Sequence, residues 1–73
     1  MEVQVDHQGS TAIVTPEGDI DLNVSRDLQT HLRDVFSKKP SRVVVDLEHV
    51  PYMDSSGVAT LVEAMQIARR QRV

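Results

Sequence analysis

Apolar side chains gather in three short stretches that are typical of strands and recur with helical spacing in two longer stretches. Residues 2–6 alternate polar and apolar, which predicts a half-buried strand. Residues 11–15 are rich in β-branched side chains and predict a second strand. Turn-forming residues 7–10 separate the two, so we expect an antiparallel hairpin. Pro16 has no N–H to donate, so the second strand should weaken there or leave that position unpaired.

Two amphipathic helices are predicted farther along the chain. The first should begin with Asn23 as its N-cap and stop before Pro40. Its apolar positions recur every three or four residues and form one stripe: Val24, Leu28, Leu32, Val35 and Phe36. The second should follow the loop 48–55, with the stripe Val58, Leu61, Val62, Met65 and Ala68. Both stripes are expected to face the core.

The third strand, residues 42–47, contains three consecutive valines, which predict burial on both faces as in a parallel sheet. The order is therefore β-β-α-β-α, which indicates an α/β fold. A right-handed crossover should place the second and third strands parallel to each other. The second helix implies a crossover to a strand that residues 1–73 do not contain. We therefore expect one small domain over residues 1–73 that is a fragment or a short version of its fold.

An uncovered third strand would leave backbone N–H and C=O groups unpaired at the edge of the sheet. We therefore expect the chain to dimerise or to exchange a strand with a second copy.

Composition narrows the classes of partner. The chain has 73 residues, no cysteine and only two aromatic side chains, and its formal net charge is −3. Without cysteine it has neither disulfides nor thiolate metal sites. An acidic chain with so few aromatic side chains is a poor candidate for binding nucleic acid. No apolar run is long enough to span a membrane, and the N-terminus lacks the features of a secretory signal. We interpret the protein as cytoplasmic.

Polar residues are concentrated in the loops that follow the second and third strands, residues 17–23 and 48–55. In open α/β sheets, ligands bind beyond the carboxyl ends of parallel strands. The two loops should meet there and collect these acidic and hydroxyl side chains: Asp19, Asp21, Glu48, Asp54, Ser55 and Ser56. The serines stand at the start of the second helix, where free N–H groups favour an anion.

Other interpretations of these residues remain. Asp54 or Ser55 could simply cap the second helix, with Gly57 relieving crowding in its first turn. Tyr52 and Met53 could form an apolar recognition patch or belong to the core. A hydrolase is disfavoured, because the sequence has no Gly-x-Ser-x-Gly nucleophile elbow and the positions of the histidines do not suggest a catalytic triad. No Walker loop is present, the histidines lack ligand spacing, and no cofactor is expected.

The stretch 43–58, VVVDLEHVPYMDSSGV, resembles the signature segment of the STAS domain family, and especially that of the bacterial anti-sigma-factor antagonists. Upstream, Gly18-Asp19-Ile20-Asp21 resembles the family's loop of glycine, acidic, apolar and aspartate residues. The resemblance covers the whole chain in order and spacing. It implies a STAS-like fold, with helices packed against a mixed sheet, in which the family's last strand and helix are missing.

The resemblance also implies a function, which is regulatory binding and not catalysis. The unphosphorylated protein would bind an anti-sigma factor that is also a serine kinase, and would thereby release the sigma factor. Phosphorylation of Ser55, the first serine after the aspartate, would end binding, and a phosphatase would restore it. The partner surface would comprise Asp19, Asp21, Asp54, Ser55, Ser56 and Gly57.

Two alternatives stay open. Within the same fold, the chain could be a STAS subunit of a lipid-transport complex or of a stressosome-type scaffold. From another class, it could be a receiver-like phosphoacceptor that holds Mg²⁺ through Asp19, Asp21 or Asp54. The absence of an acidic pair after the first strand and of a lysine after a later strand disfavours the receiver.

Overall fold

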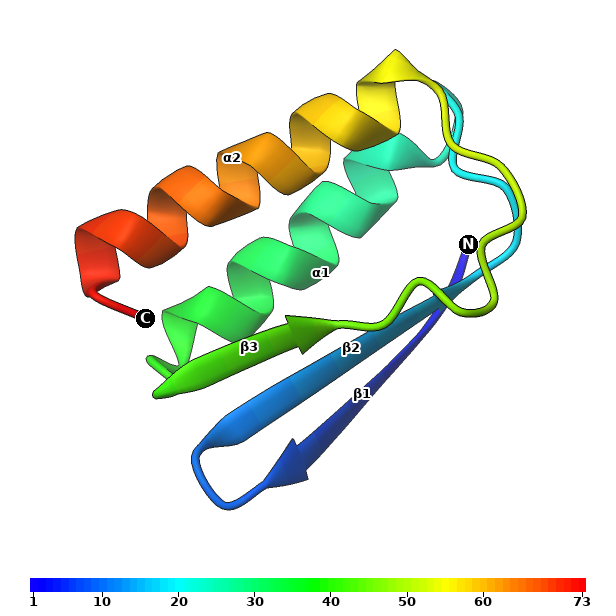
Figure 1. The fold of residues 1–73 in the computed structure, drawn as a ribbon. Coiled ribbons are helices and arrows are strands. Elements are labelled where there is room, and N and C mark those ends of the chain that lie inside the picture. Colours follow the sequence, from blue (N-terminus) through cyan, green and yellow to red (C-terminus); the bar gives the residue numbers. More distant parts are fainter.

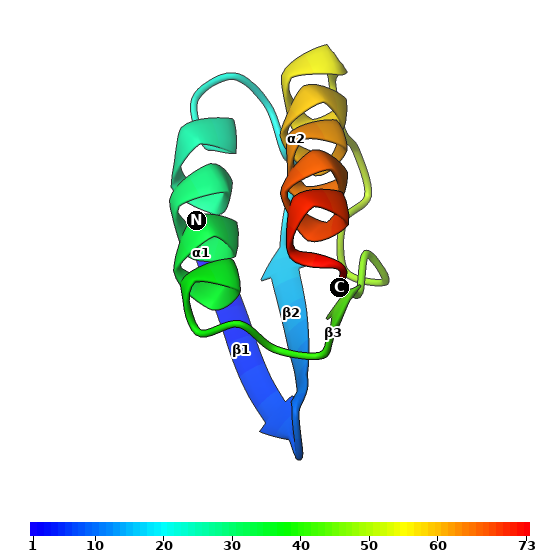
Figure 2. The same cartoon turned by 90° about the vertical axis from the view of Figure 1, so that its left-hand side faces the viewer.

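The computed structural model describes all residues 1–73 and contains five elements (Figure 1). They are β1 (Glu2–Gln8), β2 (Thr11–Glu17), α1 (Ser25–Ser37), β3 (Arg42–Val45) and α2 (Ser55–Gln71). This order confirms the predicted β-β-α-β-α arrangement. The two helices lie side by side on one face of the sheet, as Figures 1 and 2 show. Neither helix combines the length and the hydrophobicity that a membrane-spanning helix needs.

The sheet has three strands in the order β1-β2-β3 and is mixed. β1 and β2 pair antiparallel across a tight turn in which Gly9 has a φ of 62°, a conformation that glycine adopts without steric cost. β2 and β3 pair parallel through the crossover helix α1. Both pairings are those that the sequence predicts.

The strand ends differ from the prediction. β1 continues to Gln8, so the turn is shorter than expected, and β2 continues through Pro16 to Glu17. Pro16 is buried opposite Val3 of β1, whereas the pairing of β2 with β3 ends at Val14. Pro16 therefore needs no N–H on the β3 side, and the strand tolerates it there.

β3 is where the sequence interpretation was wrong. The strand ends at Val45 and not at residue 47, and its three valines are half-buried and not buried. Both helices cover the same face of the sheet, and β3 has a neighbouring strand on one side only. A run of valines predicts burial on both faces only where helices cover both.

The core lies between β2 and the two helices. Alternate residues of β2, Ala12, Val14 and Pro16, are buried on the helix side of the sheet. The predicted stripe of α1 is confirmed at its four downstream positions, while Val24 is half-buried. The buried hydrophobic side chains form one cluster: Ala12, Val14, Ile20, Leu28, Leu32, Val35, Phe36 and Ala64.

The start of α1 also differs from the prediction. Asn23 is not the N-cap; Val24 occupies that position and makes no side-chain cap bond. The chain enters the helix through a turn made by Asp21. The Asp21 carboxylate accepts a hydrogen bond from the N–H of Asn23 at 2.9 Å, and its carbonyl oxygen accepts from Val24 and Ser25. Asp21, two residues upstream, therefore accepts the N–H groups at the helix start that Asn23 was expected to bind.

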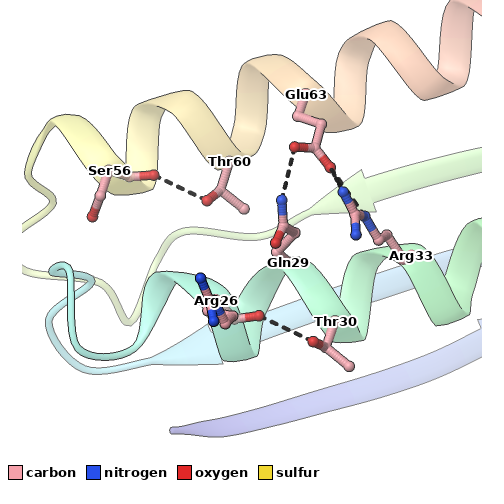
Figure 3. A network of polar contacts seen from close by, with 7 residues as sticks. All are labelled: Arg26, Gln29, Thr30, Arg33, Ser56, Thr60 and Glu63. Carbon is pink, nitrogen blue, oxygen red and sulfur yellow. Dashed lines mark hydrogen bonds and ion pairs between the residues drawn. The ribbon is translucent and has the colours of Figure 1, made fainter.

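The predicted stripe of α2 was wrong in part. The buried residues are Gly57, Thr60 and Ala64, whereas Leu61 and Ala68 are half-buried and Val58, Val62 and Met65 are exposed. Figure 3 shows that the helix presents Glu63 to α1. The Glu63 carboxylate accepts hydrogen bonds from Gln29 at 2.7 Å and from Arg33 at 2.8 Å. The face of α2 toward α1 is therefore partly polar.

Leucine truncation should separate the core from the surface. Leu28→Ala removes a side chain that is 0% exposed, so the free energy of unfolding should fall by about 2–5 kcal/mol. Leu22→Ala, the same change at a side chain that is 77% exposed, should change it by less than about 0.5 kcal/mol. Urea titration followed by circular dichroism measures both. Equal losses for the two variants would contradict this description of the core.

Candidate functional site

The loops that follow β2 and β3 lie side by side at one end of the sheet, held by backbone hydrogen bonds (Figure 1). Ile20 forms an isolated parallel bridge with Met53. The N–H of Ile20 donates to the carbonyl of Tyr52 at 2.9 Å, and the N–H of Asp54 donates to the carbonyl of Ile20 at 3.0 Å. Earlier in the same two loops, the N–H of Gly18 donates to the carbonyl of His49 at 2.9 Å. Asp54, the residue that precedes α2, is therefore positioned by the loop after β2.

Asp54 is the N-cap of α2. Its carboxylate accepts hydrogen bonds from the backbone N–H of Ser56 at 2.9 Å and of Gly57 at 3.4 Å. The Asp54 backbone is extended, with φ −91° and ψ −175°, as an N-cap residue requires. Of the two caps that the sequence left open, the structure therefore selects Asp54 and leaves Ser55 without that role.

The hydrogen bonds keep Asp54 ionised. The hydroxyl of Ser56 donates to its carboxylate at 2.6 Å and is the main reason that the pKa of Asp54 lies below its ordinary value. Partial desolvation opposes this shift, whereas the N–H groups of Ser56, Gly57 and Leu22 add to it. A negative charge is thus fixed at the mouth of α2, where the helix dipole also favours it.

The two serines of the predicted site differ in availability. Ser56 is half-buried, and its hydroxyl is committed to Asp54. Ser55 is exposed in the first turn of α2, and no hydrogen bond within the chain engages its hydroxyl. A modifying enzyme can reach Ser55 without unfolding the loop. At Ser56 it would have to break the bond to Asp54.

Gly57 is required by close packing and not by backbone conformation. A methyl group placed on its Cα would lie 2.5 Å from Cγ of Met53 and 2.8 Å from Cγ2 of Ile20. The first turn of α2 therefore presses directly on the bridge between the two loops. Met53 is half-buried and packed against the core, so of its two interpretations the core is the correct one. Tyr52 is exposed.

The remaining acidic residues surround this helix start without forming a ligand cluster. Asp21 is half-buried and serves its own turn, and Asp19 and Glu48 are exposed. No three His, Asp or Glu side chains of the chain gather closely enough to hold a metal ion. The residues that the receiver-like alternative would use for Mg²⁺ are thus not arranged as ligands.

Exposed apolar side chains flank the same helix start; the sequence pattern suggested Tyr52 for a recognition patch but not Leu22 or Val58. Leu22, Tyr52 and Val58 are all exposed. Leu22 and Tyr52 stand on the two paired loops, and Val58 lies one turn along α2 from Ser55. They add exposed apolar area near the polar groups at the start of α2. The helix-spacing pattern concealed Val58, because it assigned this residue to the core.

The sequence model of the STAS domain matches residues 2–73. The chain belongs to the STAS domain family. Structures with the same fold include an anti-sigma factor antagonist from Mycobacterium paratuberculosis, with a TM-score of 0.86 and 23% identity over 89% of this chain. SpoIIAA, a cell fate determinant of Bacillus, matches 94% of the chain in its unphosphorylated form (TM-score 0.75, 18% identity) and in its phosphorylated form (0.75, 17%).

The likeness to these solved structures concerns the fold alone. At such low identity the likeness shows a shared architecture, which confirms the predicted fold class. The chain spans 56% of the length of the mycobacterial protein and 64% of the length of SpoIIAA. Its site residues and its activity therefore have to be argued from its own side chains.

Substituting Gly57 tests the close packing at the site. In an ordinary helix, replacing glycine by alanine stabilises by up to about 1 kcal/mol. At Gly57 we expect the opposite sign, with a loss of about 1–3 kcal/mol from overpacking against Ile20 and Met53. Ala59→Gly, the reverse exchange at an exposed position of the same helix, should cost only about 1 kcal/mol. Stabilisation by Gly57→Ala in urea titration would refute the packing argument.

The ionised Asp54 cap predicts how the stability of the fold changes in acid. Because the pKa of Asp54 is lowered in the folded state, its stabilising contribution is present above the unfolded value of 3.8 and is lost as pH falls through the folded value. Asp54→Asn keeps a good N-cap but removes this titration. The variant should be less stable than the wild type near neutral pH and lose less stability on acidification, so that the two curves converge in acid.

Urea midpoints measured from neutral pH down to about pH 2.5, across the range where aspartate titrates, test this prediction. Glu63 also has a lowered pKa, chiefly because Arg33 hydrogen-bonds it, and it contributes equally to both proteins. Parallel curves for the wild type and Asp54→Asn would show that Asp54 is not coupled to folding.

Proposed function

We propose that this STAS domain is an anti-sigma-factor antagonist whose binding to an anti-sigma factor with serine kinase activity is switched off by phosphorylation of Ser55. The observation that carries the proposal is the contrast at the start of α2: Ser55 is exposed and free, while Ser56 is bonded to the capping Asp54. Family membership supports the proposal, as do the names of the similar structures, one of which was solved in both phosphorylation states.

The fold should accept the modification without rearrangement. A phosphoserine adds about −1.5 to −2 charges at neutral pH. In the first turn of a helix, the helix dipole partly compensates that charge. The hydroxyl of Ser55 takes part in no internal hydrogen bond, so its esterification breaks none. The domain should therefore remain folded in both states.

The partner should respond to the added charge. Asp54 is already ionised one residue away, so the phosphate joins a fixed negative charge. A partner that covers Ser55 would have to desolvate both groups. Burying such charges without a matching cation is strongly unfavourable. Docking is therefore lost through a local electrostatic change and not through refolding.

The unmodified surface has the composition that a protein partner needs. Tyr52, Leu22 and Val58 supply exposed apolar area next to Ser55. Asp19, Asp21 and Asp54 supply acidic groups that would attract a cationic rim on the partner. We include the apolar residues in the partner surface. Tyr52 is the expected anchor, because tyrosines that become buried at a protein interface commonly contribute much of the binding energy. The proposed role is binding that phosphorylation ends and a phosphatase restores, and it assigns no catalytic group to this chain.

Three serine variants test the switch. Ser55→Asp should weaken binding to the cognate anti-sigma factor by about tenfold or more, equivalent to at least about 1.4 kcal/mol. Ser55→Ala should bind with near wild-type affinity and should not be phosphorylated by the kinase. Ser56→Ala should still be phosphorylated on Ser55. Calorimetry gives the affinities, and mass spectrometry locates the phosphate.

Ser37→Asp is the matched control, because Ser37 is also exposed but lies at the far end of α1. It should leave the affinity unchanged. Equal affinity for the wild type, Ser55→Asp and Ser55→Ala would refute the switch. Acid-labile phosphate on an aspartate would favour the receiver-like alternative, and the absence of phosphate would favour a scaffold or transport subunit.

A further inference from the structure

We propose that a polar cavity between the starts of α1 and α2 is a subsite of the partner surface and binds the carboxylate of an acidic side chain on the anti-sigma factor. The cavity is open, has a volume of about 510 Å³ and is lined by Leu22, Asn23, Ser25, Arg26, Gln29 and Thr60. Its walls are the two helices and the loop before α1, all well inside the chain. The inference rests on the proposed function for the identity of the partner.

Buried hydroxyl groups single out this cavity. Ser25 and Thr60 are the only buried polar side chains of the chain, 7% and 8% exposed, and both line it. The Thr60 hydroxyl donates to the carbonyl of Ser56 at 2.9 Å. The Ser25 hydroxyl makes no hydrogen bond within the chain. No unpaired side-chain polar atom is sealed in the interior, so the Ser25 oxygen is reachable from the cavity. A buried hydroxyl without a partner is costly, and a ligand would supply that partner.

Arg26 brings an unpaired cation to the same cavity. Its side chain is exposed. It takes part in none of the ion pairs of the chain, which are Met1–Asp27, His31–Asp27, Arg33–Glu63 and Lys38–Asp34. Figure 3 shows Arg26 on the first turn of α1, with Thr60 directed from α2 toward α1 at the same end of the helix pair. Arginine and serine donors therefore converge on one space.

The pairing of the helices explains why Arg26 is unpaired. α1 and α2 run side by side in the same direction, and Arg33 meets Glu63 at 2.8 Å (Figures 1 and 3). Seven residues make about two helical turns, so positions 26 and 56 correspond to this pair two turns nearer the site. Position 56 is a serine whose hydroxyl is committed to Asp54. α2 thus offers a carboxylate to Arg33 but none to Arg26.

The donors select a carboxylate as the ligand. The Arg26 guanidinium has the planar fork of N–H groups that matches two carboxylate oxygens. The Ser25 hydroxyl and the Asn23 amide can donate as well. A cation would be repelled by Arg26, and an apolar group would leave the Ser25 hydroxyl unpaired. Asp54, which accepts a hydrogen bond from the N–H of Leu22, disfavours an anion of higher charge such as phosphate.

The cavity is continuous with the partner surface around Ser55. Leu22 belongs to both, and Thr60 is bonded to Ser56, the neighbour of Ser55. A protein docked over Ser55 can therefore reach the cavity with one side chain. Arg26 is the only lysine or arginine among residues 17–30 and 43–60. A partner that meets acidic groups elsewhere on this surface meets a cation only here, which fixes how it is oriented.

Substitution of Arg26 gives a test in which the sign of the effect is diagnostic. Arg26→Gln should weaken binding to the anti-sigma factor by about tenfold or more. Arg26→Lys keeps the charge but not the fork, so it should recover only part of the loss. If the partner surface carried only cations, removing Arg26 would instead tighten binding. Arg42→Gln removes an exposed cation at the opposite end of the sheet and should change the affinity by less than about twofold.

Ser25→Ala separates binding from folding. The substitution removes an unpaired buried hydroxyl and introduces a better helix former, so the free energy of unfolding should stay the same or rise. Binding to the anti-sigma factor should nevertheless weaken by about fivefold. A serine with a purely structural role would show the reverse, a loss of stability with unchanged affinity. Urea titration and calorimetry measure the two quantities.

Neutralising the aspartates and glutamates of the anti-sigma factor one at a time identifies the ligand. One carboxylate should be found whose loss weakens binding to the wild type but not to Arg26→Gln. Unchanged or tighter binding of Arg26→Gln, or the lack of such a carboxylate, would overturn the inference.

The subsite and the phosphorylation switch fail separately. Weakened binding of Ser55→Asp without any effect of Arg26→Gln would keep the switch and remove the subsite. Weakened binding of Arg26→Gln without any effect of Ser55→Asp would do the opposite. An anti-sigma factor that does not bind the wild type would overturn both.

Discussion

The backbone bridge between the loops after β2 and β3 is the contact on which the site of this STAS domain depends. Ile20 accepts from Asp54 and donates to Tyr52, so a residue from the first half of the chain places the capping aspartate of α2. Gly57 then lets the helix press against the same bridge. The position of Ser55 follows from the sheet through backbone hydrogen bonds and tight packing.

This construction is compatible with the proposed charge switch in a domain with a small core. The Asp54 carboxylate occupies the N–H groups of Ser56 and Gly57 and binds the Ser56 hydroxyl. Those bonds hold the helix start in place before any modification. The neighbouring Ser55 is left outside the network, so a change in its charge alters the surface but not the interior. A change of charge at Ser55 should therefore cost little folding stability.

The helix side of the sheet is covered unevenly. α1 buries its apolar stripe against β2, whereas α2 contacts α1 through Glu63 and exposes part of its apolar surface. The exposed apolar side chains of α2 are Val58 near its start and Val62 and Met65 in its middle. Val58 stands beside the proposed partner surface, and Met65 lines an apolar groove between α2 and β3.

The sequence by itself determined the elements, their order and the direction of each strand pairing, because these depend on local periodicity, turn residues and the handedness of crossovers. It also located the acidic loops and both serines, because the residues that begin or cap a helix are adjacent to it in the sequence. Only the tertiary structure decided which of those groups are free. The cap at Asp54, the engagement of Ser56 and the exposure of Val58 and Met65 all depend on contacts with distant segments. The half-burial of the β3 valines has the same origin: apolar character sets how strongly a side chain favours burial, but the number of covered faces is a property of the whole sheet.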